Sequence, residues 1–306
     1  MSLPIFAVLA LLGSAPNLSA STAIEVGPLP EGSEILAAAH RVVRALDFDS
    51  IAYTRGNDDG AGPILVNRSG SGRPWINRFE SHLRNRPGHG ADLLVIYHSG
   101  TLKGTAVLVN RDDGPDAHHR ITLWLPALRK TRRIARPDSS EGWTGSLFTY
   151  GEIMLGRPSD LRARIIGVRT LDRCLRSMQL ANEQHDGTLR RLPQRSCDHR
   201  GKSVYEVVST PVTPRWFDRQ EALIGARDKA PYIVRYYLHG ALVKTVETDW
   251  QPVAPGETAL FPRYSYAYTP ADARESLIYL PRASIAVNPD HPAAFWSERT
   301  LRRIRR

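Results

Sequence analysis

Histidine side chains are the first candidates for chemistry in this chain, because they bind metals and transfer protons. The sequence contains 10 His, yet it has no HExxH motif and no His pair at helical spacing beside a carboxylate. His118 and His119 are adjacent, so on a strand their side chains point to opposite faces. His82, His89 and His98 fall in or beside a predicted loop. The pattern predicts no metal site.

Nucleophile and acid–base patterns are equally sparse. The chain has no GxSxG motif, and Ser69-Gly70-Ser71-Gly72 lacks the Lys and Ser/Thr that complete a phosphate-binding loop. Cys174 has no neighbouring His that would activate its thiol. The acidic pairs Asp58-Asp59 and Asp112-Asp113 lie beside glycines, as turn residues do. We therefore expect a protein that is not an enzyme and uses no cofactor.

The charge of the chain is compatible with an anionic partner or with a soluble basic surface. The 41 Lys+Arg against 31 Asp+Glu give a net charge of +10. One basic cluster lies at 129–136 and a second ends the chain at 299–306. Nucleic-acid binding uses aromatic side chains between the basic ones, and these clusters lack them apart from the nearby Trp296, so we expect no nucleic-acid partner. The tail is expected to complement a helix end, to approach an anionic membrane surface, or to be solvated.

The first residues predict export. Leu3 to Leu12 is an apolar run followed by small residues, typical of a secretory signal that ends near residue 23. A buried first element of the mature protein is the alternative. The run is too short to cross a bilayer, and no Cys follows it for a lipid anchor. In an oxidising compartment Cys174 and Cys197 are expected to form a disulfide, with two free buried thiols as the alternative.

The predicted elements are mostly strands. Apolar residues from Glu31 to Leu46 have helical spacing, with Ser33 as the expected N-cap, and residues 54–74 predict a loop. His239-Gly240 predicts the tight turn of a hairpin, and Ser297 the cap of a short closing helix. Strands are predicted from short Val-, Ile-, Leu- and Tyr-rich runs at 92–98, 104–109, 119–125, 162–170, 203–209, 231–238, 242–248, 258–268 and 274–287.

Successive strands joined by turns predict an antiparallel sheet, not parallel βαβ units. No linker or repeat divides the chain, so we expect one domain over residues 24–306. The fold class is mainly β (α+β), with a curved sheet around a few helices. The space between the sheet and the helices is then filled by side chains or left as a ligand cavity.

The segment from Ile121 to Met154, ITLWLPALRKTRRIARPDSSEGWTGSLFTYGEIM, resembles the outer-membrane lipoprotein-sorting family, a LolA/LolB-like group of bacterial periplasmic proteins. Leu147 stands where the family commonly has an acidic residue, and Gly151-Glu152 stands where Glu-Asp is common. Weaker similarities follow in order at 203–208, 236–245 and 295–301. The resemblance covers roughly residues 31–304, with loop insertions expected near 54–90 and 172–200.

The resemblance implies a half-open antiparallel β-barrel, closed by helices, whose apolar interior receives acyl chains. It implies a non-enzymatic periplasmic carrier of a lipid or lipoprotein toward the outer membrane. The alternative is an adaptor of an inner-membrane RND/MMPL-type transporter that carries no lipid. We expect head-group or membrane contacts at Arg132, Arg133, Arg302 and Arg303. The residues expected to line the lipid cavity are Trp124, Trp143, Phe148, Tyr150 and Met154, with a filled core as the alternative.

Overall fold

The computed structural model describes residues 29–54, 62–114, 119–134, 138–180, 192 and 195–304. The predicted export signal, residues 1–23, lies outside these ranges. In the described ranges, no helix has both the length and the apolar character that crossing a bilayer requires.

Strands are the predominant secondary structure. They are β1 (Ser50–Tyr53), β2 (Ile64–Ser69), β3 (Trp75–Arg86), β4 (Gly90–Tyr97), β5 (Ala106–Asp112), β6 (Arg120–Leu125), β7 (Lys130–Ile134), β8 (Leu161–Thr170), β9 (Leu175–Arg176), β10 (Arg195–Ser196), β11 (Ser203–Pro211), β12 (Arg219–Gly225), β13 (Pro231–Leu238), β14 (Ala241–Pro252), β15 (Leu260–Thr269), β16 (Arg274–Tyr279) and β17 (Ile285–Val287).

The helices are few and short. Two are α-helices, α1 (Gly32–Val43) and α2 (Glu298–Arg303), and one is a π-helical turn, η3 (Gly151–Leu155). The other helices among the described residues are single 3-10 turns, η1 (Gly100–Leu102), η2 (Trp143–Gly145), η4 (Pro158–Asp160), η7 (Arg282–Ser284) and η8 (Ala293–Trp296).

Thirteen strands follow one another in a single antiparallel path, β7-β6-β5-β4-β3-β2-β16-β15-β14-β13-β12-β11-β8. β7 and β8 are its two ends and do not pair with each other, so the sheet is bent but not closed. The bend falls at β3, which pairs with β2 through its first residues and with β1 and β4 through its later ones.

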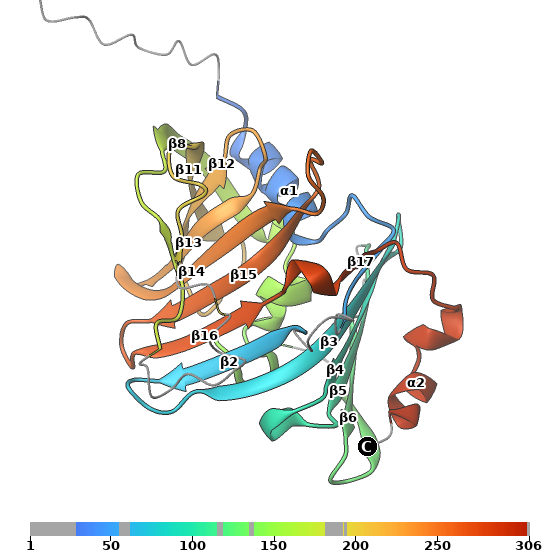
Figure 1. Ribbon diagram of the computed structural model, residues 1–306. Helices are drawn as coiled ribbons and strands as arrows, with labels where there is room; N and C mark the ends of the chain where they lie inside the picture. The colour runs from blue at the N-terminus through green and yellow to red at the C-terminus, as the bar shows by residue number, and fades with distance from the viewer. Residues whose placement is uncertain are drawn as a thin grey trace, which may run out of the picture.

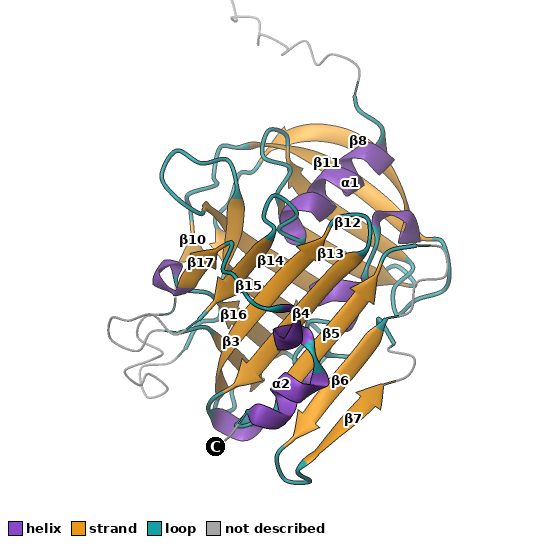
Figure 2. Ribbon diagram, turned by 90° about the vertical axis from the view of Figure 1, so that its right-hand side faces the viewer, coloured by secondary structure: helices purple, strands orange, loops and turns teal. Residues whose placement is uncertain are grey.

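Both faces of the sheet are covered. Figure 1 shows α1 and the segment around η3 between the two halves of the bent sheet, and α2 against the opposite face of β4–β6. Figure 2 views that outer face, where α2 crosses the strands. On β4, Leu93 and Val95 face the inner cluster while Leu94 and Ile96 contact the outer one, so the whole strand is buried.

Helix α1 lies close to β8 because its first residue has no side chain. A Cβ on Gly32 would lie 2.3 Å from the carbonyl oxygen of Ala163. The helix then turns Ile35, Leu36 and Ala39 onto the sheet. Its N-cap is Glu31, so the prediction of Ser33 at that position is wrong; Ser33 instead hydrogen-bonds the Glu31 side chain.

Several predicted elements are confirmed. Strand β13 has the predicted bounds, and His239 and Gly240 form the hairpin turn to β14 with positive φ angles of 51° and 81°. Ser297 is the N-cap of α2. The loop predicted at 54–74 is wrong for Ile64–Ser69, which forms β2. The insertion expected near 54–90 likewise contains β3, at the bend of the sheet.

The second expected insertion, 172–200, crosses the outer face of the sheet. We call residues 171–180 and 195–202, which lie in this insertion and directly beside it, the strap. It contains β9 and β10, and a disulfide joins Cys174 to Cys197. Met178 packs on Ile64 and Tyr264 of the sheet, so the strap is part of the packed structure.

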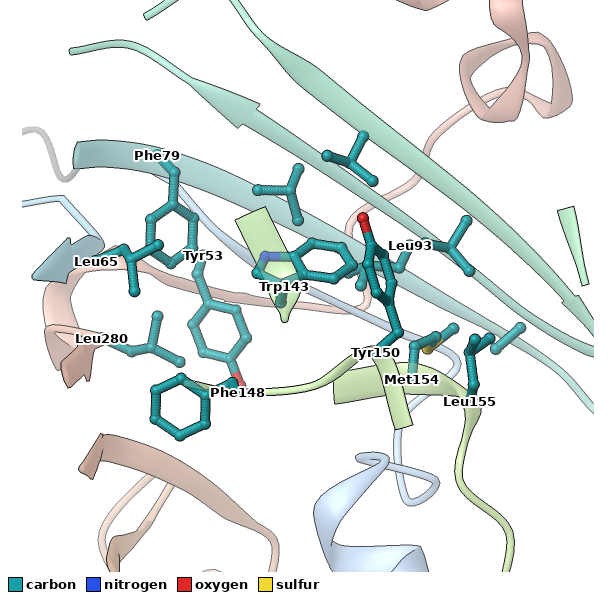
Figure 3. Close-up of a cluster of buried hydrophobic side chains, with 14 of the residues drawn as sticks. Tyr53, Leu65, Phe79, Leu93, Trp143, Phe148, Tyr150, Met154, Leu155 and Leu280 are labelled. Carbon is teal, nitrogen blue, oxygen red and sulfur yellow. The ribbon is translucent and has the colours of Figure 1, made fainter. Parts of the chain in front are cut away.

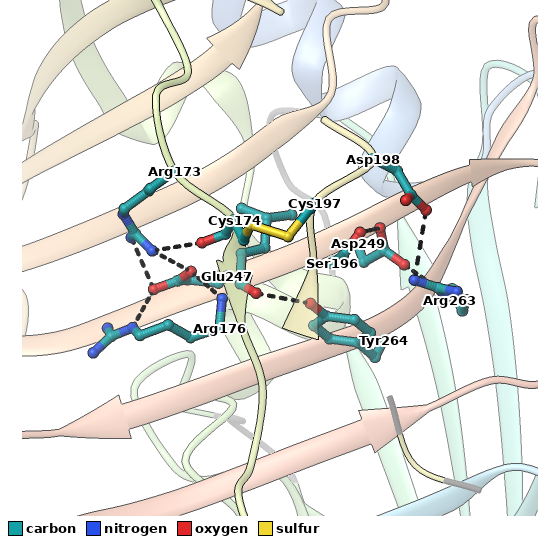
Figure 4. The surroundings of a disulfide bond; sticks show 11 residues. Arg173, Cys174, Arg176, Ser196, Cys197, Asp198, Glu247, Asp249, Arg263 and Tyr264 are labelled. Carbon is teal, nitrogen blue, oxygen red and sulfur yellow. Dashed lines mark hydrogen bonds and ion pairs between the residues drawn. A yellow bond between two sulfur atoms is a disulfide. The ribbon is translucent and has the colours of Figure 1, made fainter. Parts of the chain in front are cut away.

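The strap also holds two carboxylates of β14 that are completely buried. Glu247 accepts hydrogen bonds from Arg173, at 3.0 Å to each oxygen, and from Arg176. Asp249 accepts from Ser196 Oγ at 2.8 Å and pairs with His199 at 2.6 Å. Figure 4 shows both carboxylates around the disulfide, Glu247 with Arg173 and Arg176, and Asp249 near Ser196.

Candidate functional site: an apolar cavity inside the bent sheet

The helices do not completely fill the space inside the bent sheet. A cavity of about 400 Å³ remains, partly open to solvent, between α1, residues 139–161 and the strands. That volume lies in the range of about 300–1,000 Å³ that is typical of small-molecule sites. Most of its lining is aliphatic or aromatic, including Leu36 of α1, Val234 of β13, Val246 of β14 and Leu260 of β15.

Aromatic side chains form the wall of the cavity next to β3 and β4. Figure 3 shows Trp143 beside Tyr150, with Phe148 close to Tyr53 and Leu280. The rings of Trp143 and Tyr150 meet edge to face with centroids 5.1 Å apart. Trp143 Nε1 donates to the Tyr97 hydroxyl at 3.1 Å, so the buried indole nitrogen is satisfied.

A buried ion pair lies in the wall beside η3. Lys244 Nζ lies 2.8 Å from Glu152 Oε2, and the same oxygen accepts the backbone N–H of Thr149 at 2.7 Å. The ammonium also lies 4.2 Å from the centre of the Trp216 ring. Burial lowers the pKa of Lys244, and the charge of Glu152 offsets part of that change. Burial and then the nearby Glu152 carboxylate raise the pKa of Tyr236 well above its ordinary value.

Arg44, at the end of α1, is buried without a carboxylate bonded to it. Its guanidinium donates to backbone carbonyls of η3 and its flank, among them Gly151 at 2.9 Å and Glu152 at 3.1 Å. The guanidinium thus supplies donors at the end of the turn, where a helix leaves its last acceptors free. The Gly151 carbonyl also accepts the backbone N–H of Gly156 at 2.8 Å. Burial, followed by the charge of Arg111, lowers the pKa of Arg44 to about 9.

Three of the five predicted cavity residues line the cavity, namely Trp143, Phe148 and Met154. Tyr150 belongs to the same buried cluster but lies behind Trp143, outside the lining. The prediction for Trp124 is wrong. On β6, Ile121 faces the inner cluster, so alternation turns Trp124 outward, where it packs on the cluster of Trp296 and Leu301.

None of the four predicted contact arginines lines the cavity. Arg133 lies on the outer face with α2, whereas Arg132 alternates to the other face of β7, which carries Leu123 and Ile134 of the inner cluster. Arg132 and Arg133 are exposed on the edge strand β7, and Arg302 and Arg303 are exposed on α2. Arg133 pairs with Glu298, which Arg302 also approaches at 3.6 Å. This outer face is a candidate for membrane contact and is separate from the cavity.

Most polar residues of the site were not among the predicted site residues. Lys244 and Glu152 are 92 positions apart, yet each falls in a segment that carries the family resemblance. His40, Arg44 and Arg157 also line the cavity. The sequence did contain a signal for Arg44, because it is a charged residue among the apolar positions 42, 43 and 46 of the predicted helix.

Nothing in the described ranges suggests a reaction centre. No three His, Cys, Asp or Glu side chains there come close enough to share a metal ion. Ser196 and His199 both bond Asp249, so the serine hydroxyl is not paired with the imidazole as it would be in a nucleophilic triad. The arrangement is suited to sheltering an apolar ligand.

The sequence matches one known protein family over most of its length. A family model described as that of an uncharacterized protein matches residues 90–303. No curated protein matches the chain in sequence.

Several solved structures share the fold. An outer membrane lipoprotein-sorting protein domain from Vibrio parahaemolyticus is 15% identical with a TM-score of 0.66, over 89% of this chain and 98% of that one. A DUF1329 family protein from Desulfovibrio piger is 14% identical with a TM-score of 0.67, over 89% and 100%. A LolA superfamily protein from Nitrosomonas europaea is 12% identical with a TM-score of 0.55, over 89% and 100%. The chain therefore has a LolA-like fold, as the resemblance predicted.

Proposed function

The chain belongs to the family of uncharacterized proteins whose model spans residues 90–303, and on that premise we propose that it is a non-enzymatic carrier of acyl chains. The cargo is a lipid or lipoprotein whose hydrocarbon chains occupy the cavity during transfer across the periplasm toward the outer membrane. The observation that carries the proposal is the apolar cavity of about 400 Å³ inside a LolA-like fold.

The energetics support this use of the cavity. A hydrocarbon chain that leaves water gains about 0.8 kcal/mol per sheltered CH₂, so an apolar hollow needs no reactive group to bind one. One structural neighbour is described as a lipoprotein-sorting protein, which agrees with such a cargo. Contact with an RND/MMPL-type transporter and with the membrane surface stays a prediction of the resemblance.

Filling the cavity is expected to weaken lipid binding. Val246 lines the cavity on β14, and Val246→Trp would displace roughly three methylene groups of a bound chain. At about 0.8 kcal/mol each, the loss is about 2.4 kcal/mol, or roughly 50-fold in the dissociation constant of a fluorescent fatty acid. Ile166→Trp is the matched control, because Ile166 of β8 is exposed and outside the cavity lining.

The cargo itself is tested by extracting the purified protein with organic solvent and analysing the extract by mass spectrometry. Co-purified acyl lipid is expected from the wild type and from Ile166→Trp, and less of it from Val246→Trp. An extract without lipid, together with no binding of the fatty-acid probe, would contradict the carrier function and leave the adaptor as the better hypothesis.

A further inference from the structure

One end of the cavity is lined by the side chains of two arginines and a histidine. His40, Arg44 and Arg157 face the cavity there, and Arg111 lies close enough for its charge to act on both His40 and Arg44. We call these four residues the cationic end. They come from α1, β5 and the segment between η3 and η4, so the fold brings them together from distant positions in the chain.

Each arginine of the cationic end has a buried N–H group with no acceptor among the described residues. These groups are the Nε–H groups of Arg44, Arg111 and Arg157. Buried donors in native proteins are nearly always satisfied, by protein, by water or by a ligand. Three such donors in or beside one end of the cavity therefore point to a bound partner.

The charge at this end is also incompletely neutralised. Arg44 donates to backbone carbonyls, and Arg157 donates to the carbonyls of Asp112 and Gly114 at 3.0 and 3.2 Å. Neither guanidinium has a carboxylate within ion-pair distance in the part of the chain that the structure describes. Arg111 has Asp113 at 3.5 Å, a largely exposed acid.

The remaining acids nearby are engaged elsewhere. Glu152, which lines the cavity and whose charge acts on Arg44, pairs with Lys244 at 2.8 Å. Asp112 pairs with Arg86 at 2.9 Å, and Asp160, which lines the cavity, pairs with Arg215 at 2.9 Å. Arg86 also pairs with Asp92. Water would provide acceptors for the free N–H groups but would not neutralise the buried Arg44 guanidinium or the partly buried Arg157 beside it, and buried charges are normally paired. The missing partner is therefore an anion.

We infer that the cationic end binds the anionic head group, a phosphate or a carboxylate, of the lipid whose acyl chains fill the apolar part of the cavity. This inference rests on the proposed carrier function and names the class of cargo. Guanidinium groups suit both oxyanions, because their planar N–H donors match the spacing of the oxygen atoms.

His40 provides an internal reporter. Burial, then the charges of Arg44 and Arg111, lower the pKa of His40 to about 4, against smaller opposing contributions from the Gly156 carbonyl and from Asp113. A bound oxyanion would offset the two arginine charges, so the pKa of His40 is expected to rise when the head group binds. NMR titration of the imidazole with and without ligand measures that change directly.

The test compares ligands that share a chain and differ in the head group. Hexadecyl phosphate, hexadecanoic acid and hexadecanol are titrated into the lipid-free protein by calorimetry. We expect the two anions to bind at least about tenfold more tightly than the alcohol, since charge-assisted hydrogen bonds are the stronger ones. Arg157→Gln is expected to reduce that ratio several-fold, and Arg157→Lys to restore part of it, whereas the exposed Arg227→Gln leaves it unchanged.

The possible failures are distinguishable. If no ligand binds, the carrier function itself is wrong, and the inference falls with it. If the three hexadecyl ligands bind equally and the pKa of His40 does not change, the cavity binds lipid but the cationic end does not recognise the head group. Inorganic phosphate is the last arm: if it alone raises the pKa of His40 while hexadecyl phosphate binds no more tightly than hexadecanol, the site is for a free anion and the lipid assignment is overturned.

Discussion

Replacing Glu247 by Gln is expected to lower the free energy of unfolding by about 3 kcal/mol, the largest effect of any single change proposed here. The carboxylate is completely buried and accepts the bidentate Arg173 guanidinium, the Arg176 side chain and the Arg176 backbone N–H at 2.7 Å. An amide keeps the shape but loses the charge, and its NH₂ group faces donors. Denaturant unfolding followed by circular dichroism measures the loss.

Glu206→Gln is the matched control. Glu206 of β11 also pairs with an arginine, Arg169 at 2.8 Å, but both side chains are at least one-third exposed. Exposed pairs typically contribute less than about 1 kcal/mol. A similar loss for both variants would show that burial under the strap adds nothing to the Glu247 interactions.

The same carboxylate makes the effect depend on pH. Burial alone would raise the pKa of Glu247, but hydrogen bonds and charge from Arg173 and Arg176 outweigh it and hold the pKa below its ordinary value. A pKa that is depressed in the folded state stabilises the protein at pH values above the pKa of the unfolded state, which is about 4.3 for Glu. This stabilisation is lost as the pH falls through the pKa of the folded state. The difference in stability between wild type and Glu247→Gln should therefore be constant near neutral pH and shrink in acid.

Removing the disulfide is expected to cost nearly as much. Cys174 and Cys197 are separated by 23 positions, and a cross-link that closes a loop of this size stabilises a fold by about 3 kcal/mol, chiefly by restricting the unfolded chain. The double variant Cys174→Ser, Cys197→Ser should therefore unfold at lower denaturant concentration. Calorimetric or denaturant unfolding in the presence and absence of reductant measures the difference.

Reductant separates the cross-link from the effect of the serine side chains. The wild type in reductant should match the double variant, which itself should not respond to reductant. Equal stability of the oxidised and reduced wild type would mean that the ion pairs of the strap, not the disulfide, hold it on the sheet. Combining Glu247→Gln with the double variant should give a loss of stability that is not additive. The reason is that Arg173, which binds Glu247, also donates to the backbone carbonyl of Cys174.

The fold could be predicted where strands are short runs rich in Val, Ile, Leu and Tyr bounded by turn residues. In β13, Ile233, Arg235 and Tyr237 alternate with Val234, Tyr236 and Leu238, and the predicted bounds hold. β2 and β3 could not be predicted in this way. β3 carries many polar residues, and their partners are tertiary: Asn77 accepts the N–H of Leu102, and His82 hydrogen-bonds His291.

The site could be predicted only in part. The family resemblance locates Trp143, Phe148 and Met154, because they lie in one continuous segment. It does not locate the cationic end, whose members range from His40 to Arg157 and meet only once the sheet has bent around α1. Trp124 was misplaced because an aromatic residue on a strand does not reveal which of the two faces is the inner one.

Strand β14 has a different task on each face. Val246 and Thr248 face the cavity, while Glu247 and Asp249 anchor the strap on the other side. Point substitutions can therefore retune ligand fit without touching the anchor, and the reverse. A one-residue insertion or deletion within 246–249 would exchange the two faces of the strand. Carboxylates would then lie in the apolar cavity, and valine would lie beneath the arginines of the strap. Substitutions on one face of β14 are therefore expected to be independent of those on the other face, whereas a change in the length of the strand would disrupt both faces at once.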